Sequence, residues 1–235
     1  MRMWRIYEKN TQVDNVGEDM QPMIRSLFNA ILGVKEKYLY WTTERKERFS
    51  YVERSFAYEL YFQWKMDETV FGNPMWKHDC EICINAEITK QFDEAICNNK
   101  DWGYPDMVLH GGNNSSCNYI VCEIKRKENI DSNKESLTED INKLAFFLRD
   151  DLHIKHGNVN WTGYRYGVFI LTGQYYGGGN MEVKTGDVIS HLILDKLNVS
   201  DNLKTRIICV VYNGKDVKYN NLLDILNENN KVNNK

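Results

Sequence analysis

Two short apolar runs, joined by a loop rich in glycine, asparagine and serine, form the clearest pattern in the chain. The runs are residues 107–109 and 119–124, and the loop spans residues 111–116. Apolar runs of this length around turn-forming residues predict two adjacent antiparallel strands. Three further strands are expected, one from alternation and two from nearly unbroken apolar sequence: residues 76–90, 166–172 and 206–212.

Apolar residues at helical spacing mark segments on either side of these strands. Two capping boxes, Ser50 with Glu53 and Ser136 with Glu139, predict the starts of two helices. Together with the apolar stripes they predict helices at residues 22–33, 50–64, 136–148 and 188–197, and a last helical turn at 222–226. This order of elements predicts an α/β fold with a central mixed sheet flanked by helices and a helical extension at the N-terminus.

Length and composition fit one globular domain. The 235 residues are 42% hydrophobic and 12% aromatic, so we expect a single domain over 1–226 with its core at about 50–212. The Asn- and Lys-rich tail, 227–235, is expected to be disordered. The chain has no long apolar segment and no secretory signal, and several of its six cysteines lie inside apolar runs. These features predict a cytoplasmic protein without a membrane partner.

Charged residues at one end of the central strand pair are the candidate chemistry. Pro105 has no N–H to offer a strand ladder, so it belongs at the entrance of the first strand and places Asp106 there. Side chains alternate along a strand, so Glu123 and Lys125 share one face and lie about 6.6–6.8 Å apart. Val121 is on the same face, which predicts a face buried at one end and polar at the other. Such a cluster beside a core is a candidate functional site.

This pattern resembles the signature of the PD-(D/E)XK nuclease superfamily. Pro105-Asp106 is followed by Glu123-Ile124-Lys125, and Glu123 comes 17 positions after Asp106. The expected elements over about residues 50–172 also resemble the αβββαβ core of that superfamily, the restriction endonuclease-like fold. Glu59, in the segment ERSFAYEL, matches the position at which the family carries a metal-binding Glu on its first core helix.

The resemblance implies a Mg²⁺-dependent endodeoxyribonuclease, in which Mn²⁺ can substitute for Mg²⁺. Glu59, Asp106 and Glu123 would bind the metal, with the main-chain carbonyl of Ile124 as a further ligand. Lys125 would position or activate the attacking water. Hydrolysis of a phosphodiester requires neutralised phosphate charge and a hydroxide-like nucleophile near neutral pH, and Mg²⁺ supplies both.

Two residues of the later helix add to the resemblance. Asp140 and Lys143 lie beside its apolar stripe, and the family often directs a lysine or glutamine from this helix toward the site. A solvated charge pair is the other interpretation of these two residues. The implied partner is DNA, favoured over RNA by the family's usual substrate, and a homodimer is a compatible assembly. The net charge of −3 confines any polyanion-binding surface to a local basic groove.

Two alternatives stand beside the nuclease hypothesis. One is a catalytically silent module of the same fold that binds nucleic acid or protein. The other is an unrelated α/β domain in which the motif arose by chance. Metal-dependent cleavage by the purified protein distinguishes the nuclease from both. A silent descendant has no need to keep Glu59, Asp106, Glu123 and Lys125 together, which favours the nuclease.

Overall fold

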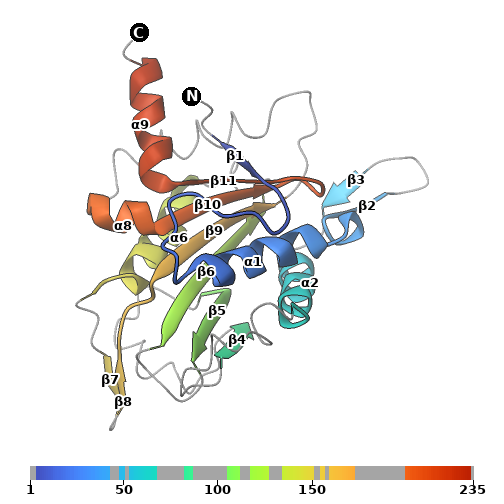
Figure 1. The fold of residues 1–235 in the computed structure, drawn as a ribbon. Coiled ribbons are helices and arrows are strands. Elements are labelled where there is room, and N and C mark those ends of the chain that lie inside the picture. The colour runs from blue at the N-terminus through green and yellow to red at the C-terminus, as the bar shows by residue number, and fades with distance from the viewer. Residues whose placement is uncertain are drawn as a thin grey trace.

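The computed structural model describes residues 4–42, 48–50, 53–67, 82–86, 105–111, 117–126, 134–150, 154–156, 159–172 and 199–233. Seven of the described strands form one open sheet in the order β1-β11-β10-β9-β6-β5-β4 (Figure 1). In chain order they are β1 (Arg5–Tyr7), β4 (Ile82–Ala86), β5 (Met107–Gly111), β6 (Asn118–Arg126), β9 (Tyr166–Thr172), β10 (Ile207–Tyr212) and β11 (Val217–Asn221). β6, β9 and β10 are parallel and their other neighbours are antiparallel, so the sheet is mixed.

Helices cover both faces of this sheet (Figure 1). One face packs against α1 and α2, and the other against α6 and α9. The helical segments are α1 (Gln21–Gly33), η1 (Glu36–Tyr38), α2 (Glu53–Lys65), α6 (Lys134–Phe147), α8 (Asp201–Arg206) and α9 (Leu222–Asn233). Two small hairpins lie outside the sheet, β2 (Tyr40–Thr42) with β3 (Arg48–Ser50) and β7 (Ile154–His156) with β8 (Val159–Trp161). None of the described helices is long and apolar enough to cross a bilayer.

The predicted α/β class with a mixed central sheet is confirmed. β5 and β6 pair antiparallel, as the two apolar runs predict, and the run at 166–172 matches β9. The predicted alternation on β6 is also confirmed. Val121 belongs to the apolar cluster beneath α6, whereas Ile120 and Ile124 belong to the cluster beneath α1 and α2. Glu123 and Lys125 therefore face α6.

Three features differ from the expectation. α2 begins at Glu53 and Ser50 lies in β3, while α6 begins two residues before Ser136, so neither predicted capping box marks the start of its helix. α9 continues to Asn233, whereas disorder was expected from residue 227. The sheet also gains β1 and β11, which the apolar pattern did not predict. The expected helix at 188–197 and most of the strand expected at 76–90 lie outside the described residues.

Candidate active site

Asp106 lies just before the start of β5, where β6 continues past the end of its pairing with β5. The last residue pair of the two strands is Met107 opposite Cys122, so the amide of Ile124 has no ladder partner on β5. Asp106 takes that place, because its Oδ2 accepts a hydrogen bond of 2.7 Å from the Ile124 amide. Buried main-chain donors need such partners, and a proline before Asp106 ends the ladder. The sequence Pro105-Asp106 thus fixes a carboxylate against the middle of the Glu123-Ile124-Lys125 segment.

Glu123 is the buried carboxylate of the cluster. Only 2% of the residue is exposed, and Lys143 on α6 lies with its Nζ 2.7 Å from Glu123 Oε2. The other oxygen, Oε1, is buried and accepts no hydrogen bond from any described residue. Burial raises the pKa of Glu123 well above its ordinary value, and the charge of Asp106 raises it further, whereas Lys143 lowers it. Burial therefore stabilises the protonated form of Glu123 relative to a solvated glutamate, and a further cation beside it would favour the ionised form.

Lys125 is held by a carboxylate from the same helix. Its Nζ lies 2.7 Å from Oδ2 of Asp140, and both side chains are mostly buried. Lys143 Nζ lies 3.9 Å from the other oxygen of Asp140, one helical turn away. Burial alone would lower the pKa of Lys125, but its hydrogen bond to Asp140 and the charges of Asp140, Glu53 and Asp106 raise the pKa above the ordinary value. Lys125 is therefore an ammonium ion at neutral pH.

The carboxylate that α2 contributes to this cluster is Glu53. As the first residue of the helix, it accepts a hydrogen bond of 3.1 Å from the Arg126 amide at the end of β6. Its negative charge also contributes to raising the pKa of Asp106 and Lys125. The sequence prediction did not assign Glu53 to the site, because the capping-box pattern gave this residue a local role. To assign Glu53 to the site, one has to know that α2 begins next to the end of β6.

Glu59, the residue that the family resemblance selects on α2, lies elsewhere on the helix. It is about 9 Å further along the axis than Glu53 and rotated from it by about 120°. Its Oε1 accepts a hydrogen bond of 2.7 Å from Gln63 on the same helix. Among the described residues, the structure brings Asp106, Glu123 and Lys125 together with Glu53, Asp140 and Lys143, whereas the contact it gives Glu59 is the one with Gln63.

The donor set at this end of the sheet suits a cation that keeps much of its water. The described parts of the chain contain no group of three or more His, Cys, Asp or Glu side chains that could hold a metal ion. The candidate ligands are the unpartnered Glu123 Oε1, the second oxygen of Asp106 and the Ile124 carbonyl. That carbonyl lies on the same strand edge as its amide, facing Asp106. Mg²⁺ commonly binds through one or two carboxylates and several waters, so these residues fit it.

The arrangement brings a strong electrostatic field to one small volume. Four carboxylates, from Glu53, Asp106, Glu123 and Asp140, surround two ammonium groups, from Lys125 and Lys143. Burial raises the pKa of Asp106, and the charges of Glu53 and Asp140 raise it further, while the Ile124 amide and Lys143 lower it. Excess negative charge in a poorly hydrated place favours a bound cation.

Comparisons with protein-family models, with curated proteins and with solved structures give no match.

Proposed function

We propose that this protein is a metal-dependent nuclease of the PD-(D/E)XK type that hydrolyses phosphodiester bonds in DNA. The single observation that carries the proposal is the convergence of Asp106, Glu123 and Lys125 at the start of β5, with the buried Glu123 Oε1 lacking a partner among the described residues. The order α2-β4-β5-β6-α6-β9 supports a restriction endonuclease-like core. Cleavage of plasmid and oligonucleotide DNA by the purified protein, with and without Mg²⁺, tests the proposal.

Each residue has a physical role in this proposal. Asp106, Glu123 and the Ile124 carbonyl would hold Mg²⁺, which when bound neutralises phosphate charge and lowers the pKa of a ligated water. Lys125 places a positive charge beside those oxygens, where it can orient the attacking water and stabilise developing negative charge. Asp140 fixes the Lys125 side chain by the 2.7 Å ion pair, so little reorganisation is needed during the reaction.

The identity of the cation should separate binding from cleavage. Ca²⁺ uses the same oxygen ligands as Mg²⁺, but with looser geometry and longer bonds. We expect Mg²⁺ and Mn²⁺ to support cleavage, and Ca²⁺ to support DNA binding with cleavage at least ~100-fold slower, because weaker polarisation raises the barrier by about 3 kcal/mol. A binding assay run beside a cleavage assay in each cation checks this. Equal cleavage in EDTA, Ca²⁺ and Mg²⁺ would rule out a metal site at these carboxylates.

Two glutamates of α2 form a matched pair for testing the metal site. Glu53 contacts the Arg126 amide at the site, whereas Glu59 pairs with Gln63. We expect Glu53→Gln to weaken Mn²⁺ binding, measured by calorimetry, by about tenfold. Losses of this size are typical when a carboxylate that contacts a metal or orients its ligands is removed. Glu59→Gln should leave the Mn²⁺ affinity within about twofold of the wild type. The reverse ranking would return the helix ligand to Glu59, as the family resemblance implies.

A specific observation favours the second candidate, a silent binding module. Both Glu123 and Asp140 already have lysine partners at 2.7 Å, so their charges are partly satisfied without a metal. Buried ion pairs of this kind also occur as purely structural features. Calorimetric titration with Mn²⁺ distinguishes the two, because a silent module with these lysines in place should show no binding that depends on Asp106 or Glu123.

A further inference from the structure

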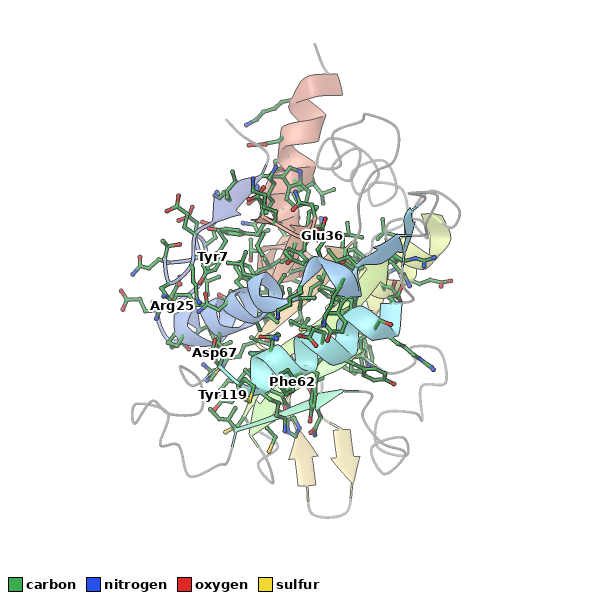
Figure 2. All side chains as sticks on the ribbon, turned by 90° about the vertical axis from the view of Figure 1, so that its right-hand side faces the viewer. Tyr7, Arg25, Glu36, Phe62, Asp67 and Tyr119 are labelled. Carbon is green, nitrogen blue, oxygen red and sulfur yellow. The ribbon has the colours of Figure 1, made fainter. Side chains whose placement is uncertain are left out.

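The outward side of α2 carries a continuous row of large apolar and basic side chains. Tyr58, Phe62 and Met66 follow each other at intervals of four residues and are 57%, 56% and 64% exposed. Tyr61 and Lys65 lie beside this row, and Arg54 stands at its start. We call these six residues the α2 outer face. Figure 2 views the molecule from this side, with α2 in front and Phe62 labelled on it.

Folding does not require this row. The core-facing stripe of α2 is formed by Phe56, Leu60 and Trp64, all of which are buried under the helix. The exposed row lies on the opposite side and leaves most of its apolar area in water. Single exposed apolar residues are normal, but three on successive turns of one helix form a contiguous patch, and such patches commonly mark binding surfaces.

Two exposed basic residues lie on the row or beside it. Arg54 and Lys65 are both exposed, and the Lys65 Nζ lies 5.1 Å from the centre of the Tyr61 ring. Both acidic residues of the helix are turned to other partners, Glu53 to the Arg126 amide and Glu59 to Gln63. A surface that combines flat rings with exposed basic groups suits a ligand with planar apolar faces and negative charge. Nucleic acid has both.

The row also begins beside the candidate active site. Arg54 directly follows Glu53, whose carboxylate contacts the end of β6 next to Lys125. From there the row extends along α2 for about 18 Å, at 1.5 Å per residue. A strand bound along the row would therefore run toward the end of β6 at which the candidate site lies.

We propose that the α2 outer face binds a single-stranded segment of nucleic acid by stacking its bases on Tyr58 and Phe62, with Arg54 and Lys65 near the phosphates. This inference rests on the proposed function only in treating the bound nucleic acid as the substrate. Tyr58 and Phe62 are about 6 Å apart along the helix, whereas bases in a duplex stack about 3.4 Å apart. A duplex keeps its base faces inside the stack, so only unpaired bases can place their faces on these rings.

The test uses fluorescence anisotropy with a 20-nucleotide oligothymidine, in Ca²⁺ and on the Asp106→Asn background to suppress cleavage. Stacking contributes about 1–3 kcal/mol per base, so the double variant Tyr58→Ala/Phe62→Ala should bind at least about tenfold more weakly. Lys65→Gln should weaken binding and flatten its salt dependence. Ile6→Ala is the matched control, because Ile6 is 52% exposed on the edge strand β1 and should leave affinity unchanged. Thermal melting confirms that each variant folds.

Three companion measurements decide between outcomes. Oligouridine should bind like oligothymidine, because stacking does not read the sugar, and a blunt duplex should be insensitive to the double variant. Equal loss of duplex and single-strand binding would overturn the single-strand assignment. Unchanged oligonucleotide affinity, with a wild-type dimer that becomes monomeric in the double variant by sedimentation, would assign the face to a second copy instead. If no metal supports cleavage but the rings still govern oligonucleotide binding, the proposed function fails and this inference stands.

Discussion

Glu123→Gln is expected to abolish metal-dependent cleavage and at the same time to raise the melting temperature of the metal-free protein. The substitution removes one of two carboxylates that would hold the metal, and the loss of several kcal/mol of charge stabilisation slows cleavage by about 1,000-fold or more. The stability gain comes from burial. Desolvation and the neighbouring Asp106 raise the pKa of Glu123 more than Lys143 lowers it, so a neutral isostere suits the site better than the ionised side chain.

The pH dependence of that gain follows from the direction of the pKa shift. A carboxyl group with a raised pKa binds its proton more tightly in the folded protein than in the unfolded chain. The free energy of unfolding therefore falls as pH rises above the unfolded value of about 4.3 and through the folded pKa. Glutamine has no ionisable group, so the variant lacks this pH dependence. The difference in melting temperature between Glu123→Gln and the wild type should be largest at pH 7–8 and shrink toward pH 4.

Calorimetric melting from pH 4 to pH 8 in EDTA, together with plasmid cleavage in Mg²⁺, measures both effects. In a chain of this size each 1 kcal/mol shifts the melting temperature by about 2–4 °C. Addition of Mg²⁺ should stabilise the wild type and leave Glu123→Gln unaffected. A variant that melts lower than the wild type at pH 8, and still cleaves, would remove Glu123 from the metal site.

Lys125→Met should reduce the turnover rate by about 10²–10⁴-fold while leaving DNA affinity in Ca²⁺ nearly unchanged. This range is typical for the loss of a group that acts on a proton or on charge in the transition state. Methionine keeps the length of the apolar stem, and Asp140 retains a second lysine neighbour, Lys143, whose Nζ lies 3.9 Å from it in the wild-type protein. Single-turnover cleavage and anisotropy binding separate the two effects.

Arg126→Gln is the control for Lys125→Met, because Arg126 follows Lys125 in β6 and its side chain points to the other face of the sheet. A basic residue that contacts only phosphates should weaken binding and flatten its salt dependence without changing single-turnover cleavage of the bound DNA. Lys127, the next basic residue, lies outside the described residues. If Lys125→Met and Arg126→Gln both merely weaken binding, the β6 end is a basic binding surface and the silent module is the better interpretation.

The sequence predicted the part of the site that depends on local rules. Proline at position 105 sets the entrance of β5, and the period of two along β6 places Glu123 and Lys125 together. Both rules depend only on residues close together in the sequence, so they can be applied without knowing the fold. The helix α6 was likewise predicted with its apolar face correct, since Leu137 and Ile141 are buried against the sheet.

The rest depends on contacts between distant parts of the chain. Glu53 and Arg126 are 73 residues apart, and the hydrogen bond between them depends on how α2 lies on the sheet. Local patterning cannot distinguish Glu53 from Glu59 on that basis. The same limit explains the C-terminus, where an Asn-rich composition predicted disorder. Leu222 and Ile225, in the helical turn that was predicted, pack into the core beneath the sheet, and α9 extends from this anchored turn to Asn233.

The charged end of β6 has a consequence for how the sheet assembles. From Tyr119 to Cys122 the strand is apolar on both faces, so a shift of one residue against β5 would exchange similar side chains and meet little resistance. The same shift would turn Glu123 and Lys125 away from α6 and press both charges into the apolar layer beneath α1 and α2. Glu123 and Lys125 thus also select the correct register of β6 against β5. Replacing both with apolar residues would make a shifted register more favourable, in addition to removing the proposed activity.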